Sequence, residues 1–249
     1  MNNEENDIFK SIEENNFTLF KQLFNKDFNR DYIKKLILTT ISNKHDNIEI
    51  LKEILDNQSF FSASSAKNVI FSYSCNLNKV KTVKHLIERS DFIFDDYYQD
   101  SFADICFSGK QEIFDILYKH PKTDVNYNSN KCLCKSYSGQ KISIFKTLLN
   151  NEKIDISYNN HFLLVRFFDF RKFEFIKIIL EQEPYKDLKQ KLKNFDLNNL
   201  TNDKNYLLKI LFSFKEYQKS IKLYLLNERR QADIEDFNKL YISNKVIDF

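Results

Sequence analysis

A short pattern of residues recurs six times over roughly the first three-quarters of this chain, and it strongly constrains the fold. Each copy begins with an apolar residue, which we call the anchor, followed at once by a charged residue and within a few positions by an apolar pair. Successive anchors are separated by a nearly constant interval, the repeat length, of about 31 residues. Apolar residues with this pattern fall on one face of a helix of roughly three turns, so the six copies predict a helical repeat array. The anchors are Phe20, Leu51, Val83, Phe114, Phe145 and Ile176.

The position five residues before each anchor is expected to close one helix and turn the chain into the next. Gly109 holds this position in the fourth copy, and Gly139 lies one residue earlier in the fifth. Asn15, Asp46 and Asn78 hold it in three other copies. Gly, Asn and Asp are the residues that best tolerate the left-handed conformation of such a turn.

Glycine and proline are otherwise nearly absent, with two of each in 249 residues. This shortage argues against β-sandwiches, Rossmann domains and phosphate-binding loops, which need glycine-rich turns, and it favours an all-helical protein. Pro121 and Pro184 follow their anchors by seven and eight residues, where a second helix must stop. Each repeat is therefore expected to contain a short helix, a tight turn, a longer helix and a loop.

The fourth copy carries a resemblance to a known family. Residues 109–120, Gly-Lys-Gln-Glu-Ile-Phe-Asp-Ile-Leu-Tyr-Lys-His, resemble the second helix of an ankyrin repeat, and residues 121–126, Pro-Lys-Thr-Asp-Val-Asn, resemble the entry to its hairpin. Residues 153–157, Lys-Ile-Asp-Ile-Ser, repeat that entry. The resemblance covers about residues 5–184, although no copy holds the Thr-Pro-Leu-His motif of the family. It implies an all-α fold, an α-solenoid of six to seven degenerate ankyrin-like helix-turn-helix repeats with a C-terminal helical cap.

The segment from residue 185 to residue 249 breaks the period. A charged stretch precedes two apolar pieces, residues 205–214 and residues 220–226. The second piece resembles another anchor-bearing helix, with Ile221 as its anchor, but it follows Ile176 by well over one repeat length. Because the last unit of a solenoid otherwise exposes an apolar face, a cap is expected here. We therefore predict an array of about six repeats, each of about 30–32 residues, over 1–184, with an insertion, a modified repeat and a helical cap packed on it over 185–249.

Composition bears on compartment and partners. The first ten residues are polar and acidic, which argues against a secretory signal. No run approaches the roughly 18 apolar residues of a membrane helix, so no membrane association is expected. Four cysteines without such a signal predict free thiols in a reducing compartment, and we expect a cytoplasmic protein. A net charge of only +3 argues against nucleic acid as the partner.

Residue types that serve catalysis and metal binding are scattered along the chain. Cys75 and Cys106 both lie eight residues before an anchor, where we expect small core residues. Cys132 and Cys134 form a C-x-C pair without a histidine at zinc-finger spacing, so no metal site is expected. The four histidines fall in different repeats, and no known catalytic motif occurs. We therefore expect no catalytic residue, no metal and no cofactor, and hypothesise that the protein is not an enzyme.

The loops between repeats supply the candidate contact residues. Tyr127 and Tyr158 follow the two hairpin entries and are one repeat length apart, so stacked repeats would place them in one row. Tyrosine is enriched at binding hot spots because it offers a large area with a polar tip. The alternative is that these residues only form soluble turns. The predicted partner-binding residues are Asp95, Asp96, Tyr97, Tyr98, Tyr127, Asn128, Tyr158, Asn159 and Asn160.

These observations favour a non-catalytic scaffold, adaptor or inhibitor that binds another protein. The ankyrin resemblance implies that the hairpin tips and first helices line a concave contact surface. Two alternatives stay open. One is an adaptor or effector in which residues 185–249 recruit a second protein, an arrangement that viral and intracellular bacterial ankyrin proteins resemble. The other is an enzyme or a nucleotide-binding protein with a site grafted on the solenoid.

Overall fold

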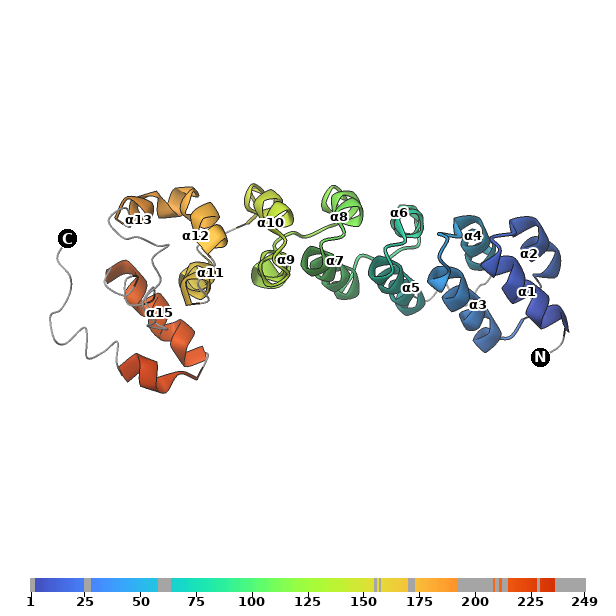
Figure 1. The fold of residues 1–249 in the computed structure, drawn as a ribbon, viewed down its shortest axis with the longest axis horizontal. Helices are drawn as coiled ribbons and strands as arrows, with labels where there is room; N and C mark the ends of the chain where they lie inside the picture. The colour runs from blue at the N-terminus through green and yellow to red at the C-terminus, as the bar shows by residue number, and fades with distance from the viewer. Residues whose placement is uncertain are drawn as a thin grey trace.

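A computed structural model describes residues 3–24, 28–57, 64–154, 156, 158–169, 173–191, 208, 211, 215–227 and 229–235. These residues form α-helices and one short 3-10 helix, and none of them lies in a strand. The prediction of an all-α fold is therefore confirmed. In Figure 1 the helices form one elongated row.

The helices come in pairs that lie side by side along the row. The first helices of the pairs are α1 (Asn3–Glu13), α3 (Arg30–Ser42), α5 (Ser64–Asn76), α7 (Asp96–Ser108), α9 (Tyr127–Ser138) and α11 (Tyr158–Asp169). The second helices are α2 (Phe17–Leu23), α4 (Ile48–Asp56), α6 (Val80–Glu88), α8 (Gln111–Tyr118), α10 (Ile142–Leu149) and α12 (Phe173–Leu180). In Figure 1 helices α5, α7, α9 and α11 lie along one edge, and α6, α8, α10 and α12 lie along the other. Helix α7 contacts both α5 and α9, so neighbouring pairs pack directly on one another.

The relative lengths of the paired helices differ from the expectation. The first helices α5 and α7 have 13 residues each, whereas the second helices α6 and α8 have 9 and 8. The predicted short first helix is therefore wrong. The carboxylate of Asp95 explains this at α7, because it accepts hydrogen bonds from the N–H groups of Tyr97 and Tyr98 and so starts the helix inside the predicted loop.

The turn between paired helices has the same backbone conformation in several copies. In four copies the residue five positions before the anchor has a left-handed φ, as predicted for three of them. In three copies the following N–H donates to a carbonyl five residues earlier, from Asn16 to Ser11 (2.8 Å), from Lys79 to Ser74 (2.9 Å) and from Lys141 to Ser136 (2.8 Å). The left-handed residues at this position are Asn15 (φ 54°), Asn78 (φ 59°), Gly109 (φ 79°) and Gln140 (φ 57°).

Two predicted turn residues have other roles. Gly139 has a φ of −79°, so the left-handed conformation expected there is wrong. A Cβ on Gly139 would lie 2.0 Å from the backbone oxygen of Phe107, which means that the position requires a residue without a side chain. Asp46 is also not left-handed. Its carboxylate instead accepts hydrogen bonds from the N–H of Lys81 (2.7 Å) and the hydroxyl of Thr82 (2.6 Å), and so caps α6 in the next pair.

In three copies the residue four positions before the anchor ties its pair to the preceding one, and we call it the bridging residue. Asn47 donates from Nδ2 to the carbonyl of Ile12 (2.8 Å), near the end of α1. Lys79 donates from Nζ to carbonyls just after α3, including that of His45 (3.2 Å). Lys110 donates to the carbonyl of Asn76, the last residue of α5 (2.8 Å). The last carbonyls of a helix lack partners within the helix and carry partial negative charge, so these donors stabilise the junction between pairs.

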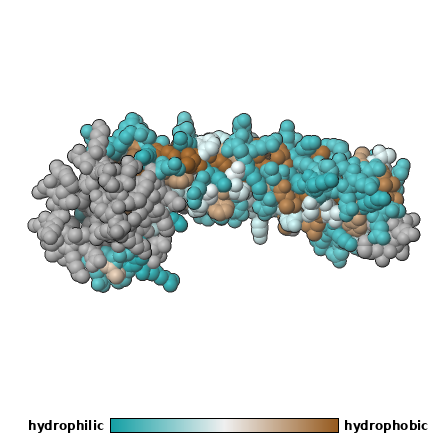
Figure 2. Space-filling model, viewed as in Figure 1, coloured by the Kyte–Doolittle hydropathy of each residue, from teal (hydrophilic) through white to brown (hydrophobic). Residues whose placement is uncertain are grey.

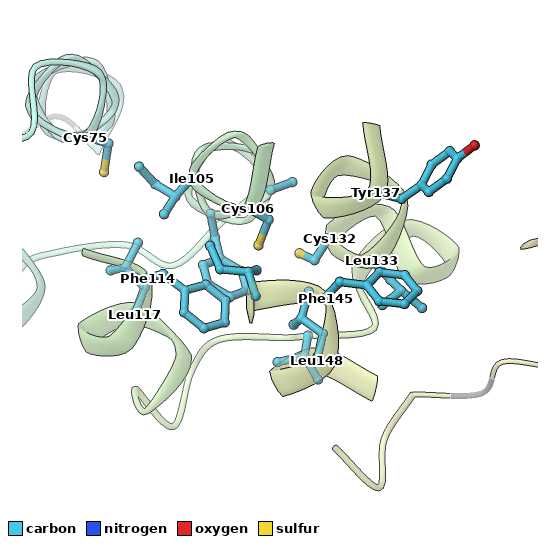
Figure 3. Close-up of a cluster of buried hydrophobic side chains, with 14 of the residues drawn as sticks. Cys75, Ile105, Cys106, Phe114, Leu117, Cys132, Leu133, Tyr137, Phe145 and Leu148 are labelled. Carbon is cyan, nitrogen blue, oxygen red and sulfur yellow. The ribbon is translucent and has the colours of Figure 1, made fainter. Parts of the chain in front are cut away.

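A continuous apolar core runs between the two layers of helices. All six anchors are buried, and so are the twelfth and eighth residues before the anchor in five copies. Cys75 and Cys106 belong to this set, which confirms that they are core residues. Burial raises the pKa of both thiols. Figure 3 shows the sulfur atoms of Cys106 and Cys132 facing each other beside Phe114 and Phe145.

The described part of the C-terminal segment extends the row. A 3-10 helix, η2 (Glu183–Tyr185), and α13 (Lys186–Lys191) follow α12, and α15 (Lys215–Asn227) packs against α11. Arg229 after α15 has a left-handed φ of 57°, and Arg230 donates to the carbonyl of Leu225 (2.8 Å). This is the turn that follows first helices elsewhere in the chain. Ile234, five residues after Arg229, is buried, and so is Ile221, the anchor that the sequence suggests.

Candidate binding surface

On α5, α7 and α9 the fourteenth and tenth positions before the anchor form a surface that we call the outer face. Val69 on α5 is 64% exposed and Tyr73 is 42% exposed. The equivalent side chains on α7 and α9 are charged and are exposed or half-buried. Equivalent backbone positions therefore carry apolar, acidic and basic side chains on three neighbouring helices. The residues of the outer face are Val69, Tyr73, Asp100, Asp104, Lys131 and Lys135.

Ion pairs join the acidic and basic helices of the outer face. Lys131 lies 2.6 Å from Asp100, and Lys135 lies 2.9 Å from Asp104, in each case from Nζ to Oδ1. The hydrogen bond from Lys131 to Asp100 raises the pKa of the lysine. Exposed pairs of this kind each contribute about 0.2–1 kcal/mol to stability. Their larger consequence is that they hold the two rows of side chains in register.

A groove of about 210 Å³ separates α5 from α7. The hydroxyl groups of Ser72 and Ser101 share a hydrogen bond between its two walls. Tyr97 lines the groove and is 71% exposed. The residues that line it are Ser72, Cys75 and Asn76 from α5, and Tyr97, Asp100, Ser101 and Asp104 from α7.

A second groove, of about 360 Å³, lies between α10 and α12. Lys146, Lys177 and Glu181 line it together with Leu149 and Ile178. These residues come from second helices or the turn after them. In Figure 2 hydrophilic side chains project along much of the edge where the second helices lie. Charges of both signs therefore surround this groove, and none of the described residues that line it is aromatic.

The structure separates the predicted contact residues around the start of α7. Asp96 and Tyr97 are exposed in the first turn of that helix, not in a hairpin loop. Asp95 is committed to the fold, because its carboxylate caps α7 and also accepts a hydrogen bond from Asn68 (2.7 Å). Tyr98 is fully buried, and its hydroxyl shares a hydrogen bond with that of Thr123. The prediction that Tyr98 contacts a partner is therefore wrong.

Burial also changes the acidity of Tyr98, raising its pKa to about 12. The phenol therefore stays protonated at physiological pH. Its ring stacks on Phe71 of α5, with 5.2 Å between the ring centroids. Tyr98 is thus a core side chain that joins two first helices.

Tyr127 and Asn128 form the first turn of α9, again not a hairpin loop. Tyr127 is half-buried, and Nζ of Lys131 lies 5.7 Å from its ring centroid. Partial desolvation and the nearby carboxylates of Asp100 and Asp96 raise the pKa of Tyr127. Asn128 is exposed. Both residues lie beside the outer face.

The last three predicted contact residues begin α11, which starts at Tyr158. The side chains of Tyr158, Asn159 and Asn160 lie outside the described residues. The tyrosine row expected from the repeat spacing is therefore described at Tyr127 only.

Sequence reasoning missed the charged part of the outer face, although the signal was present. Asp100 and Lys131 are one repeat length apart in the sequence, and so are Asp104 and Lys135. Opposite charges separated by one repeat length predict an ion pair between neighbouring helices when the repeats stack in register. Val69 and Tyr73 lacked a comparable signal, because apolar residues in a helix are normally assigned to the core.

Among the described residues no group of three or more His, Cys, Asp or Glu side chains is placed to hold a metal ion. No helix in the described ranges has the length and apolar character needed to cross a membrane. Comparison with protein-family models, with curated proteins and with solved structures gives no match.

Proposed function

We propose that the chain is a degenerate ankyrin-like solenoid that acts as a non-catalytic scaffold and binds a partner protein on its outer face. One observation carries the proposal. The twelfth and eighth positions before the anchor are apolar and buried in five copies, whereas the fourteenth and tenth change from apolar to acidic to basic across α5, α7 and α9. Core positions that stay alike while surface positions diverge are typical of repeat proteins whose stacked surface recognises a partner.

The arrangement also favours binding on energetic grounds. The outer-face side chains project from helices whose backbone is already fixed by the core and by the bridging residues. Association then requires little further ordering of the chain, which is the main cost that weakens flexible binding surfaces. Tyr73 and Tyr97 add large exposed aromatic side chains of the kind that dominate binding energy at interfaces.

The proposal is tested by affinity capture from a lysate of the source organism, with the full chain as bait. The test variant is Tyr73→Ala/Tyr97→Ala/Tyr127→Ala, and circular dichroism first establishes that it is folded. A matched control is Leu223→Ala/Leu226→Ala, which truncates two exposed side chains of α15. We expect a partner that the wild type and the control retain and that the test variant loses. A partner that all three proteins retain equally would place binding outside the outer face.

A further inference from the structure

The groove between α5 and α7 has two chemically different sides. On α5, the side chains at i, i+3, i+4 and i+7 form one stripe, which begins with the exposed Val69 and includes the exposed Tyr73. On α7, the stripe at the same spacing begins with Tyr97 and includes Asp100 and Asp104. On the α5 side the groove is lined by Ser72, Cys75 and Asn76, and the exposed Val69 and Tyr73 belong to the same stripe as Ser72 and Asn76. On the α7 side it is lined by two carboxylates and an exposed aromatic ring.

The charged side chains that line the groove are carboxylates. Of the seven described residues that line it, two are carboxylates and none is basic. Lys131 and Lys135 pair with these carboxylates from α9, which lies on the opposite side of α7 from α5 (Figure 1). These two lysines therefore lie on the side of α7 away from the groove. A third lysine, Lys110, lies near the α5 side, where its Nζ donates to the carbonyl of Asn76 (2.8 Å). The groove lining itself presents Asp100 and Asp104.

The size of the groove also limits what it can bind. Its volume of about 210 Å³ is below the range of about 300–1,000 Å³ that is usual for small-molecule and cofactor pockets. A single side chain of a protein ligand is a better match. An arginine side chain matches the carboxylates and the aromatic ring of the groove. Its guanidinium hydrogen-bonds to carboxylates and stacks on aromatic rings such as that of Tyr97.

We infer that this groove binds an arginine side chain of the partner, from a peptide segment in which a large apolar residue beside the arginine packs on Val69 and Tyr73. The inference rests on the proposed function and specifies the chemistry of the partner. The carboxylates of Asp100 and Asp104 select the positive charge. The exposed apolar side chains of α5 select the neighbouring residue.

The test uses a phage-displayed library of random peptides, about 12 residues long so that each can span the two helices in extended form, selected on the full-length chain. We expect enriched peptides to share an arginine next to an apolar residue. One such peptide, labelled with a fluorophore, is then titrated by fluorescence polarisation against the wild type and Asp104→Asn. Loss of the charged hydrogen bond is expected to weaken binding by about 10- to 100-fold. Replacing the arginine of the peptide with glutamine should weaken its binding to the wild type by a similar factor. The same replacement should weaken its binding to Asp104→Asn little further.

One control variant and one further groove variant keep this test decisive. Asp115→Asn makes the same change at an exposed residue of α8 and should leave the affinity for the peptide unaltered. Tyr97→Ala, at a position that is 71% exposed, provides a second groove variant if Asp104→Asn does not fold. Enriched peptides without arginine, an Asp104→Asn affinity equal to that of the wild type, or no enrichment at all would each overturn the inference.

The outcomes also separate this inference from the proposed function. Peptides that Tyr73→Ala/Tyr97→Ala/Tyr127→Ala loses and Asp104→Asn retains would support a scaffold and reject the arginine groove. Selection of peptides that match segments of this chain itself would point to self-association. If the full chain then sedimented as a dimer, and the Asp104→Asn variant as a monomer, the groove would bind a second copy of the chain. That result would overturn the inference of a separate partner.

Discussion

Gly109 and Gly139 occupy neighbouring turns, and each must be a glycine for a different physical reason. Gly109 has a φ of 79°, which a residue with a Cβ adopts at a cost of about 1–2 kcal/mol. Gly139 has an ordinary φ, but the backbone oxygen of Phe107 occupies the place of a Cβ. Gln140 then takes the left-handed position in the same turn, with a φ of 57°.

This contrast predicts the order of three substitutions. Gly109→Ala should lower the free energy of unfolding by about 1–2 kcal/mol, through its φ. Gly139→Ala should lower it further, because the new Cβ meets backbone that cannot move without shifting α7. Gln140→Gly should raise it by about 0.5 kcal/mol, since relief of the left-handed strain exceeds the entropy that glycine loses on folding. Urea denaturation followed by circular dichroism measures all three, and a Gly139→Ala protein as stable as Gly109→Ala would contradict the steric argument.

Tyr97 and Tyr98 show where sequence reasoning fails at the level of single residues. The two are adjacent and chemically identical, and sequence alone assigned both to a binding loop. In the structure Tyr97 is 71% exposed and Tyr98 is 0% exposed. The difference follows from the residue at which α7 begins, because the helix fixes which way each successive side chain points. That starting residue depends on the cap by Asp95, which the local pattern did not identify.

At the scale of helices, the sequence predicts contacts within a pair better than contacts between pairs. The anchors and the turn residues Asn15, Asn78 and Gly109 follow from helical periodicity and backbone preference, which are local properties. The bridging lysines were not predicted. Lys79 and Lys110 bond to carbonyls more than one repeat length earlier in the chain, and no local rule identifies a partner at that distance.

The bridging residues give a prediction at this scale. Lys79→Met should lower the free energy of unfolding by about 1–3 kcal/mol, because it leaves carbonyls near the end of α3 without their donor. Lys110→Met removes one hydrogen bond at an exposed site and should cost about 0.5–1 kcal/mol.

Lys84→Met is the matched control for the bridging lysines. Lys84 pairs with Glu88 across an exposed surface, at 4.0 Å, and its loss should change stability by less than about 0.5 kcal/mol. Urea denaturation of the three variants measures these differences. If Lys84→Met and Lys79→Met proved equally costly, the bridges would have no special role in joining the pairs.

At the scale of the whole molecule, each helix pair packs mainly on its immediate neighbours. Contacts join α6 to α8 and α7 to α9, while the two ends of the row lie far apart in Figure 1. Stability in such a row is a sum over pairs and junctions, not the property of one central core. A unit of one repeat length is therefore removable in principle without disturbing the rest.

We test this by deleting residues 110–140, which joins Gly109 directly to Lys141. Lys141 then takes the place of Lys110 after the closing turn, and α10 pairs with α7. This protein should stay helical and monodisperse, with a lower urea midpoint. Deletion of residues 110–136 removes less of the chain but breaks the register, and we expect it to lose cooperative unfolding. If the two deletion proteins were equally helical, equally monodisperse and equally cooperative in unfolding, the assignment of a 31-residue repeat register would be wrong.

The row of pairs has a mechanical consequence as well. When the chain is pulled from both ends, force passes through each junction in series, so the weakest junction yields first while the remaining pairs stay folded. Each released repeat of about 31 residues frees roughly 100 Å of contour length. The molecule should therefore extend in steps under tension, and its helix pairs should refold one after another when the force is removed.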